Sequence, residues 1–110
     1  MPNVKLFADH LLLQDCGQSL ENRLPALRDL LCDRLGVTLS ACHIVVIPVR
    51  ALQDQPPVNV ELHILPRPER TTGRIREICA EIKDIVSDVT GKPTAVRCAM
   101  LDPLTYVALK

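Results

Sequence analysis

The sequence is poor in aromatic side chains and carries no net charge. Phe7 and Tyr106 are its only aromatic residues, and thirteen Lys and Arg residues balance thirteen Asp and Glu residues. Proteins that bind single-stranded nucleic acids stack the bases on exposed aromatic rings and attract the phosphates with a basic surface. The composition therefore argues against nucleic acid as a partner.

Long apolar runs are also missing. No segment approaches the roughly 18 apolar residues that a membrane-spanning helix needs, and the start of the chain lacks the basic and then apolar pattern of a secretory signal. We expect no membrane partner and a cytoplasmic location.

The cysteines form no recognisable metal or redox motif. There are five, an odd number, without a C-x-x-C pair: Cys16, Cys32, Cys42, Cys79 and Cys98. A free cysteine is commonly a small buried hydrophobic residue, and free thiols are typical of a reducing compartment. We predict no metal site and no cofactor.

The first half of the chain predicts a strand, a helix and a second strand. Residues 3–8 alternate apolar and polar side chains, and residues 42–49 are a β-branched apolar run. Between them one apolar helical face recurs at steps of three and four: Leu20, Leu24, Leu27, Leu31 and Leu35. Because proline is tolerated in a first helical turn, we expect the regular helix to start close to Pro25, after a connection over 9–18. Gly36 supplies its end.

The second half repeats this order after a loop at 50–57. Strands are predicted at 58–65 and 94–101, and Thr71 or Thr72 is placed to cap the helix between them. The helical stripe before Gly91 consists of Ile75, Ile78, Cys79, Ile82, Ile85, Val86 and Val89.

The two halves also share individual residues at a nearly constant separation. Asn3-Val4-x-Leu6 returns 56 positions later as Asn59-Val60-x-Leu62, and the pairs Gly36/Gly91 and Pro48/Pro103 are 55 positions apart. We predict one domain, residues 1–110, made of two βαβ repeats at about 1–49 and 58–103. The fold class is α+β, with a four-stranded mixed sheet and two helices on one face.

An oligomer is expected from the second face of that sheet. The runs at 42–49 and 94–101 are apolar on both sides, although both helices cover only one. Other copies of the chain would bury the remaining face. Residues 105–109 are left over as a short strand that could pair with the sheet edge of a neighbour.

Met1-Pro2 directly before a strand, together with the duplicated βαβ unit and the short C-terminal strand, resembles the tautomerase superfamily. That family includes 4-oxalocrotonate tautomerase and macrophage migration inhibitory factor. The resemblance implies a homotrimer without a cofactor, in which removal of the initiator methionine leaves an N-terminal proline as the catalytic group.

The chemistry expected of Pro2 follows from its amine. An unperturbed terminal amine titrates near pH 8. An apolar pocket and neighbouring cations disfavour the ammonium form, so that the neutral amine can act as a base at pH 7. Val58 occupies the matching place in the second repeat, so only the first repeat can carry this group.

A small carboxylate substrate would need cationic or hydrogen-bonding partners. The resemblance points to Arg67 and Arg70 in the PRPER segment, with a solvated loop as the alternative reading. Arg97 interrupts an apolar strand and either faces a site or pairs with an acidic residue. His43 is a hydrogen-bond donor to the site or an interface residue, and Arg50 is a weaker candidate.

Several functions are compatible with these features. The first is a tautomerase or other isomerase acting on an enol/keto or 2-hydroxy-dienoate acid, with decarboxylase and hydratase chemistry as variants of the same amine. The second is a non-catalytic trimeric relative that binds a partner or serves as a scaffold. The third is a ferredoxin-like module that binds a small molecule.

Overall fold

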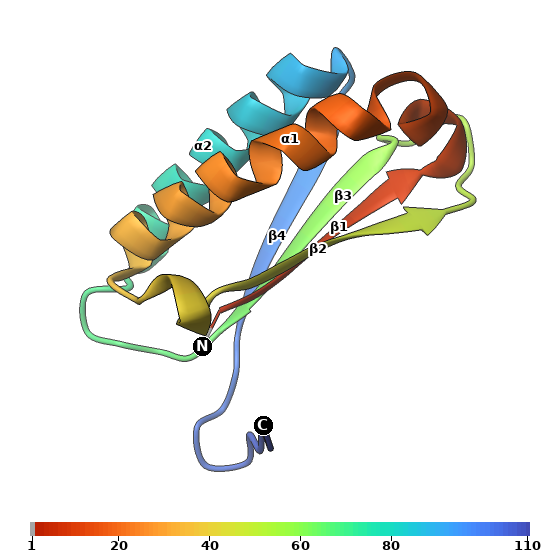
Figure 1. The fold of residues 1–110 in the computed structure, drawn as a ribbon. Coiled ribbons are helices and arrows are strands. Elements are labelled where there is room, and N and C mark those ends of the chain that lie inside the picture. The colour runs from red at the N-terminus through yellow and green to blue at the C-terminus, as the bar shows by residue number, and fades with distance from the viewer. Residues whose placement is uncertain (1) are drawn as a thin grey trace.

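The computed structural model describes residues 2–110, which form one four-stranded sheet and two long helices (Figure 1). The strands lie in the order β2-β1-β3-β4, with β1 parallel to β2, β3 parallel to β4, and the central pair β1 and β3 antiparallel. In chain order the elements are β1 (Asn3–Asp9), α1 (His10–Leu35), the 3-10 turn η1 (Leu39–Ala41), β2 (His43–Val49), β3 (Val58–Ile64), α2 (Thr72–Thr90) and β4 (Thr94–Met100).

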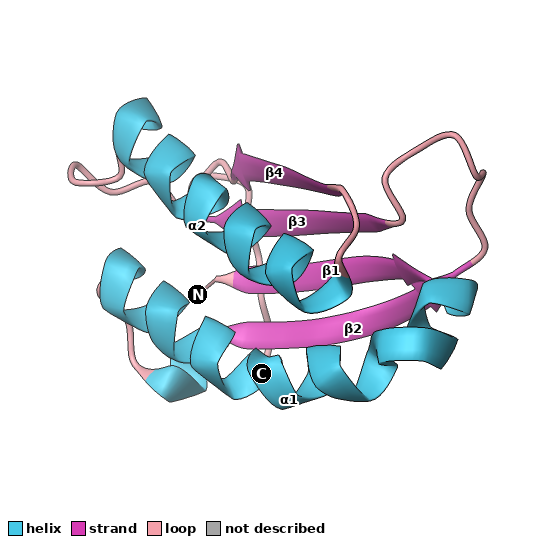
Figure 2. Cartoon of the chain, turned by 90° about the horizontal axis from the view of Figure 1, so that it is seen from above, coloured by secondary structure: helices cyan, strands magenta, loops and turns pink. Residues whose placement is uncertain are grey.

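Both helices cover the same face of the sheet, and the core lies between these two layers (Figure 2). Val4, Leu6 and Ala8 of β1 point towards the helices and are completely buried. The predicted duplicated βαβ architecture, with a mixed sheet and two helices on one face, is therefore confirmed. Within residues 2–110, neither helix is both long and apolar enough to cross a membrane.

The register of the central strands reveals an approximate twofold relation between the two halves. Lys5 lies opposite Glu61, while Asn3 lies opposite His63 and Phe7 opposite Asn59. A shift of 56 residues exchanges the last two pairs and leaves the first pair unchanged. The repeated NVxL segment thus occupies equivalent positions in β1 and β3, and its third residues, Lys5 and Glu61, pair with each other.

The outer strands do not keep this offset. Asn3 pairs with His43 and its counterpart Asn59 pairs with Ala95, so β2 and β4 are related by 52 positions. The connection before β2 is longer because it contains η1. The predicted match between Pro48 and Pro103 is therefore wrong, since Pro48 lies within β2 and Pro103 lies beyond the end of β4.

Helix α1 begins at His10, well before the expected start near Pro25. The Asp9 carboxylate accepts a hydrogen bond from the Leu11 amide (3.1 Å) and caps the helix. The apolar stripe also continues upstream of Leu20 at steps of four through Cys16 and Leu12. The predicted connection over 9–18 is thus helical, and Pro25 lies on the exposed side of a continuous helix.

We expect Pro25→Ala to stabilise the protein. Proline at this position cannot donate a helical hydrogen bond to the Glu21 carbonyl. Alanine restores that bond and has the most favourable helix propensity of the natural residues. The free energy of unfolding, measured in urea, should rise by about 1–3 kcal/mol. Pro66→Ala, in the exposed loop after β3, is the matched control and should bring no such gain. An unchanged or lower value for Pro25→Ala would contradict a continuous α1.

Helix α2 follows its prediction closely. The Thr71 hydroxyl accepts a hydrogen bond from the Arg74 amide (3.2 Å), which settles the choice of cap between Thr71 and Thr72. The helix ends at Gly91, whose φ of 66° lies in the left-handed region that favours glycine. Gly36 ends α1 in the same way, with a φ of 67°.

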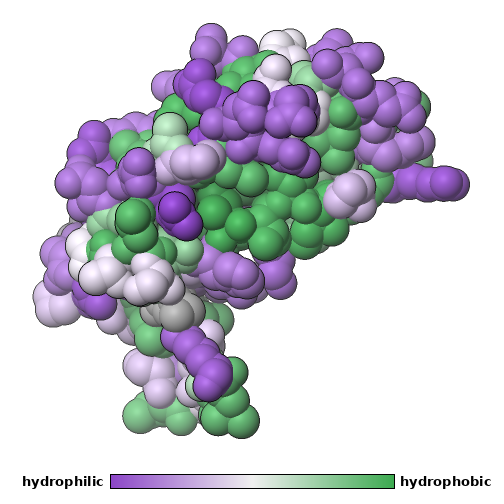
Figure 3. All heavy atoms as spheres, in the orientation of Figure 1, coloured by the Kyte–Doolittle hydropathy of each residue, from purple (hydrophilic) through white to green (hydrophobic). Residues whose placement is uncertain are grey.

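The face of the sheet away from the helices is more polar than expected. Its central row contains Lys5, Glu61 and Arg97, whereas apolar residues gather mainly on β2, where Val45, Ile47 and Val49 are half-buried. Figure 3 shows a continuous hydrophobic area along β2 below α1. The apolar surface is therefore concentrated at one edge of the sheet.

The C-terminal tail forms no strand in the single chain, in contrast to the expectation for 105–109. It extends away from the layers beyond β4 (Figure 1). Leu104, Val107 and Leu109 are 92%, 79% and 93% exposed. Any strand pairing by this segment requires a second molecule.

Candidate functional site

Pro2 is buried at the start of the central strand β1. Its carbonyl accepts a hydrogen bond from the His43 amide (2.9 Å), which ties the beginning of β1 to the beginning of β2. Residues of the same parity in β1 face the helices, so Pro2 lies on the helix side of the sheet, near the C-terminal end of α1. The hydrogen bond to β2 and the burial of Pro2 thus fix its position.

The residue before β2 lies beside Pro2, and one turn of α1 lies near that residue. Cys42 continues the β1–β2 register next to Pro2 and is buried. Burial raises the pKa of Cys42 to about 11 with the help of the adjacent Cys32, while the nearby positive charge of Arg28 acts in the opposite direction. Since Arg28 and Cys32 are four residues apart in α1, they project from the same side of the helix. Sequence reasoning did not single out Arg28.

Arg70 lies close to this end of the sheet, and two of its guanidinium nitrogens are engaged, while its buried Nε has no hydrogen-bond partner among residues 2–110. The residue is only 6% exposed. Its NH1 donates to the Leu65 carbonyl (2.7 Å) and its NH2 to the Leu35 carbonyl (3.0 Å), so it joins the end of β3 to the end of α1. Burial and then the charge of Arg67 lower the pKa of Arg70. These contacts give Arg70 an architectural role.

Arg67 is exposed on the loop between β3 and α2. Its NH1 lies 3.4 Å from the Gly36 carbonyl, a long hydrogen bond to the end of α1. Arg67 and Arg70 therefore belong to the same end of the molecule as Pro2. Of the two, Arg67 is the one whose guanidinium is open to solvent.

The other predicted site residues belong to the opposite face of the sheet. By strand parity His43 projects away from the helices, beside Asn3, although its amide contacts Pro2. Arg97 lies in the central row of that face, next to Glu61, and its NH1 donates to the Asn59 side chain. Arg50 is exposed and lines a surface cavity of about 340 Å³ on this face. A single chain does not bring these three side chains together with Pro2.

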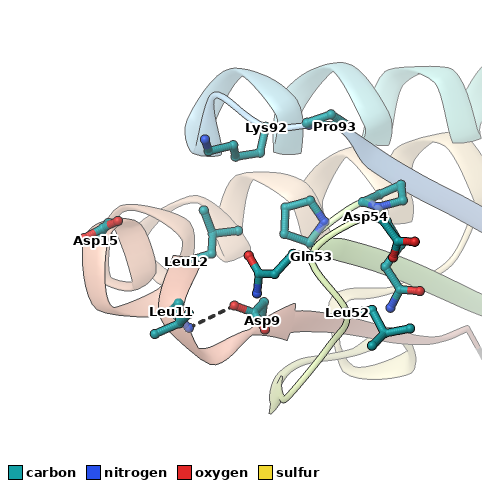
Figure 4. Close-up of a pocket in the computed structure, with 12 residues that line it drawn as sticks. Asp9, Leu11, Leu12, Asp15, Leu52, Gln53, Asp54, Lys92 and Pro93 are labelled. Carbon is teal, nitrogen blue, oxygen red and sulfur yellow. Dashed lines mark hydrogen bonds between the residues drawn. The ribbon is translucent and has the colours of Figure 1, made fainter.

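A larger surface cavity, of about 610 Å³, lies at the other end of β1 (Figure 4). It is bordered by the start of α1, the loop after β2 and the turn before β4, with Leu12, Gln53 and Lys92 among the lining residues. The Asp9 carboxylate in its wall accepts bonds from the Leu11 and Ala51 amides (3.1 Å each) and holds the loop. Residues 3–8 of β1 separate Asp9, in the wall of this cavity, from Pro2, a distance of about 23 Å at the usual rise of a strand.

The cysteines remain free thiols in the described part of the chain. Burial raises the pKa of Cys98 to about 11, with a further contribution from Cys79, so this thiol stays protonated at neutral pH. Across residues 2–110 no three metal-ligating side chains converge on one point. The thiols act as small apolar residues of the core.

Comparison with known proteins shows which solved structures share this fold. No family model and no curated protein matches the sequence. Among solved structures, a wild-type fused 4-OT described as an asymmetric trimer has a TM-score of 0.71 at 14% identity and covers 96% of this chain and 91% of its own. A member of the cis-3-chloroacrylic acid dehalogenase family has a TM-score of 0.67 at 16% identity, with 96% and 79% coverage.

A macrophage migration inhibitory factor-like protein from Entamoeba histolytica is also similar, with a TM-score of 0.63 at 8% identity and coverage of 97% of this chain and 94% of that one. The chain thus has the fold of the tautomerase superfamily, as the sequence resemblance implied. At these identities the likeness establishes the fold and leaves the reaction open.

Proposed function

We propose that this protein is a tautomerase-like isomerase that uses the amine of Pro2 as a general base on a small enol/keto or 2-hydroxy-dienoate acid. The observation that carries the proposal is the position of Pro2, which is buried at the start of the central strand in a fold shared with 4-OT and macrophage migration inhibitory factor-like proteins. The amine exists once Met1, which lies outside the described residues, has been removed.

The surroundings of Pro2 favour a neutral amine. Burial disfavours the ammonium form, and the positive charge of Arg28 in the same region acts in the same direction. The neutral nitrogen takes a proton from the enol hydroxyl of the substrate, and the resulting ammonium delivers a proton to carbon. The enzyme is regenerated without a cofactor.

We further propose a homotrimer located in the cytoplasm. The apolar edge at β2, the exposed tail leucines and the trimeric fused 4-OT support the assembly, and the five free cysteines suit a reducing compartment. The tail segment 105–109 would pair with the sheet edge of a neighbour. Such an assembly could bring residues of the open sheet face, including Arg97, towards the Pro2 site of another subunit.

A non-catalytic trimeric relative is the second candidate. The observation that favours it is the engagement of Arg70 with two main-chain carbonyls, because this removes one of the arginines expected to hold a substrate. A binding or scaffold protein would keep the fold and the assembly without needing a free amine at Pro2.

The proposal predicts three results for the purified chain. Intact mass should show loss of Met1, sedimentation should give three times the mass of the 12.2 kDa chain, and phenylenolpyruvate or 2-hydroxymuconate should be tautomerised faster than in buffer. A trimer without Met1 that fails to accelerate either substrate would favour the non-catalytic relative. Retention of Met1 would exclude Pro2 as the base.

A further inference from the structure

The cavity between the start of α1, the loop after β2 and the turn before β4 has the size of a ligand site. Its volume of about 610 Å³ falls within the range of roughly 300–1,000 Å³ that is usual for ligand pockets. Its apolar wall contains the buried Leu12 together with Leu11 and Leu52, which are 48% and 71% exposed (Figure 4). A ligand with an apolar body would remove part of this leucine surface from water.

The buried Asp9 ties two walls of the cavity together. Its carboxylate is only 6% exposed and accepts hydrogen bonds from the Leu11 amide of α1 and from the Ala51 amide of the loop (3.1 Å each). As the cap of α1, Asp9 also offsets the partial positive charge at the start of that helix. The cavity is therefore preformed in the single chain, and the helix end is not free to attract an anion.

The charged side chains that line the cavity favour a cation. Asp15 of α1 and Asp54 of the loop are exposed, as is Lys92 in the turn before β4. None of these three belongs to the ion pairs formed among residues 2–110, which are made by Arg34 and Arg74. Together with Asp9, three carboxylates and one ammonium group line the cavity, so its charge is predominantly negative.

The twofold relation between β1 and β3 shows that the two ends of the sheet carry opposite charges. A shift of 56 residues relates segment 9–15, which follows β1 and lines the cavity, to segment 65–71, which follows β3 near Pro2. The second segment carries Arg67 and Arg70, whereas the first carries Asp9 and Asp15. A ligand of the cavity should therefore differ in charge from the small carboxylate proposed for the Pro2 end.

We propose that this cavity binds a small organic ammonium ion with an apolar body, such as an arylalkyl amine. The ammonium group would lie near Asp15 and Asp54, and the apolar body would contact the leucines of the wall. The proposal goes beyond the tautomerase function, because the cavity lies about 23 Å from Pro2 and binding requires no reaction.

Binding of 2-phenylethylamine, which is protonated at pH 7, tests this inference. The uncharged 2-phenylethanol and the anion 3-phenylpropanoate present a similar apolar body. Each compound is titrated into the protein at low salt while backbone amide NMR signals are followed. We expect the amine to shift the signals of Leu52, Gln53 and Lys92 and to bind more tightly than the alcohol, with the anion weakest. High salt should weaken amine binding, because exposed charges are screened.

Two charge variants should change the amine affinity in opposite directions. Asp54→Asn should weaken it about 2- to 5-fold through loss of an exposed ion pair, and Lys92→Gln should strengthen it by a similar factor through loss of a like charge. Both should leave the affinity for 2-phenylethanol unchanged. Asp84→Asn and Lys83→Gln make the same charge changes at exposed positions of α2 outside the cavity, and they should not alter amine binding.

Leu52→Ala tests the apolar wall separately from the charges. It should weaken the binding of amine and alcohol by the same factor, about 2- to 10-fold, because both lose the same apolar contact. Leu39→Ala is the matched control, since Leu39 is an exposed leucine of η1, outside the cavity. It should change neither affinity.

Several results would overturn the inference. They are absence of amine binding to the parent, binding of the alcohol or the anion as tight as that of the amine, and equal amine affinities of Asp54→Asn and Asp84→Asn. Shifts confined to the cavity near Arg50 would also place the ligand elsewhere. Pro2→Ala should leave amine binding unchanged, so loss of the tautomerase proposal and loss of this site are separate outcomes.

Discussion

Pro2→Ala is expected to lower kcat/KM for the tautomerised substrate by about 10²- to 10⁴-fold, the usual contribution of a positioned general base. Alanine keeps a terminal amine after Met1 is removed, but it replaces the ring that fixes the direction of the nitrogen and changes a secondary amine into a more flexible primary one. Because Pro2 contributes only one backbone carbonyl to the sheet, the fold should persist. Steady-state kinetics together with the unfolding midpoint measure both effects.

Selective acetylation of the N-terminal amine provides the complementary experiment. It leaves the proline ring in place and removes the basicity of its nitrogen, so the loss of activity should be at least as large as in Pro2→Ala. Equal rates for the parent, Pro2→Ala and the acetylated protein would show that the nitrogen takes no part in the reaction. Pro25→Ala, which alters an exposed proline of α1, should leave the kinetics unchanged.

Arg70→Met should lower the free energy of unfolding by about 2–3 kcal/mol, because the substitution leaves two carbonyls without their donors at a buried position. The Leu35 carbonyl belongs to the last turn of α1 and the Leu65 carbonyl directly follows β3, so both elements lose the same support. Urea denaturation of the parent and the variant under identical protein concentration gives the value.

Arg67→Met is the matched control for Arg70→Met, since the two residues lie in the same loop and differ in burial. Its single long bond to Gly36 is solvent-exposed, and its loss should change stability by less than about 0.5 kcal/mol. A stable Arg70→Met protein with a strongly raised KM would instead assign Arg70 to substrate binding, as the sequence resemblance implied.

The strands and α2 could be predicted because local signals and tertiary structure agree there. Alternation places Val4, Leu6 and Ala8 in the core, and the left-handed glycines end both helices where expected. The start of α1 differs from the prediction because a proline within a helical stripe is typical of a first helical turn, and Pro25 lies instead in the interior of the helix. Packing of one long apolar face against the sheet outweighs the missing hydrogen bond of that proline.

The candidate site was less predictable than the fold. Sequence reasoning identified Pro2 from its position, and the structure adds that this residue is buried. It could not show that Arg70 donates to main-chain carbonyls, because these contacts join Arg70 to the end of β3 and to the end of α1, which is distant in sequence. Residue type alone does not report which arginine donates to main-chain carbonyls.

The approximate twofold relation across Lys5 and Glu61 has a consequence for the number of reactive groups. The twofold relation makes the beginning of β1 equivalent to the beginning of β3, which lies at the opposite end of the sheet. Val58, the first residue of β3, is joined to the preceding loop by an ordinary peptide bond and has no free amine. A linked pair of equivalent halves can therefore expose only one imino nitrogen for every two βαβ units. Titration of the N-terminal nitrogen with an alkylating reagent should accordingly saturate at one equivalent per polypeptide. The residues around the beginning of β3 are not required to keep a reactive amine, so their sequence can diverge from that around Pro2.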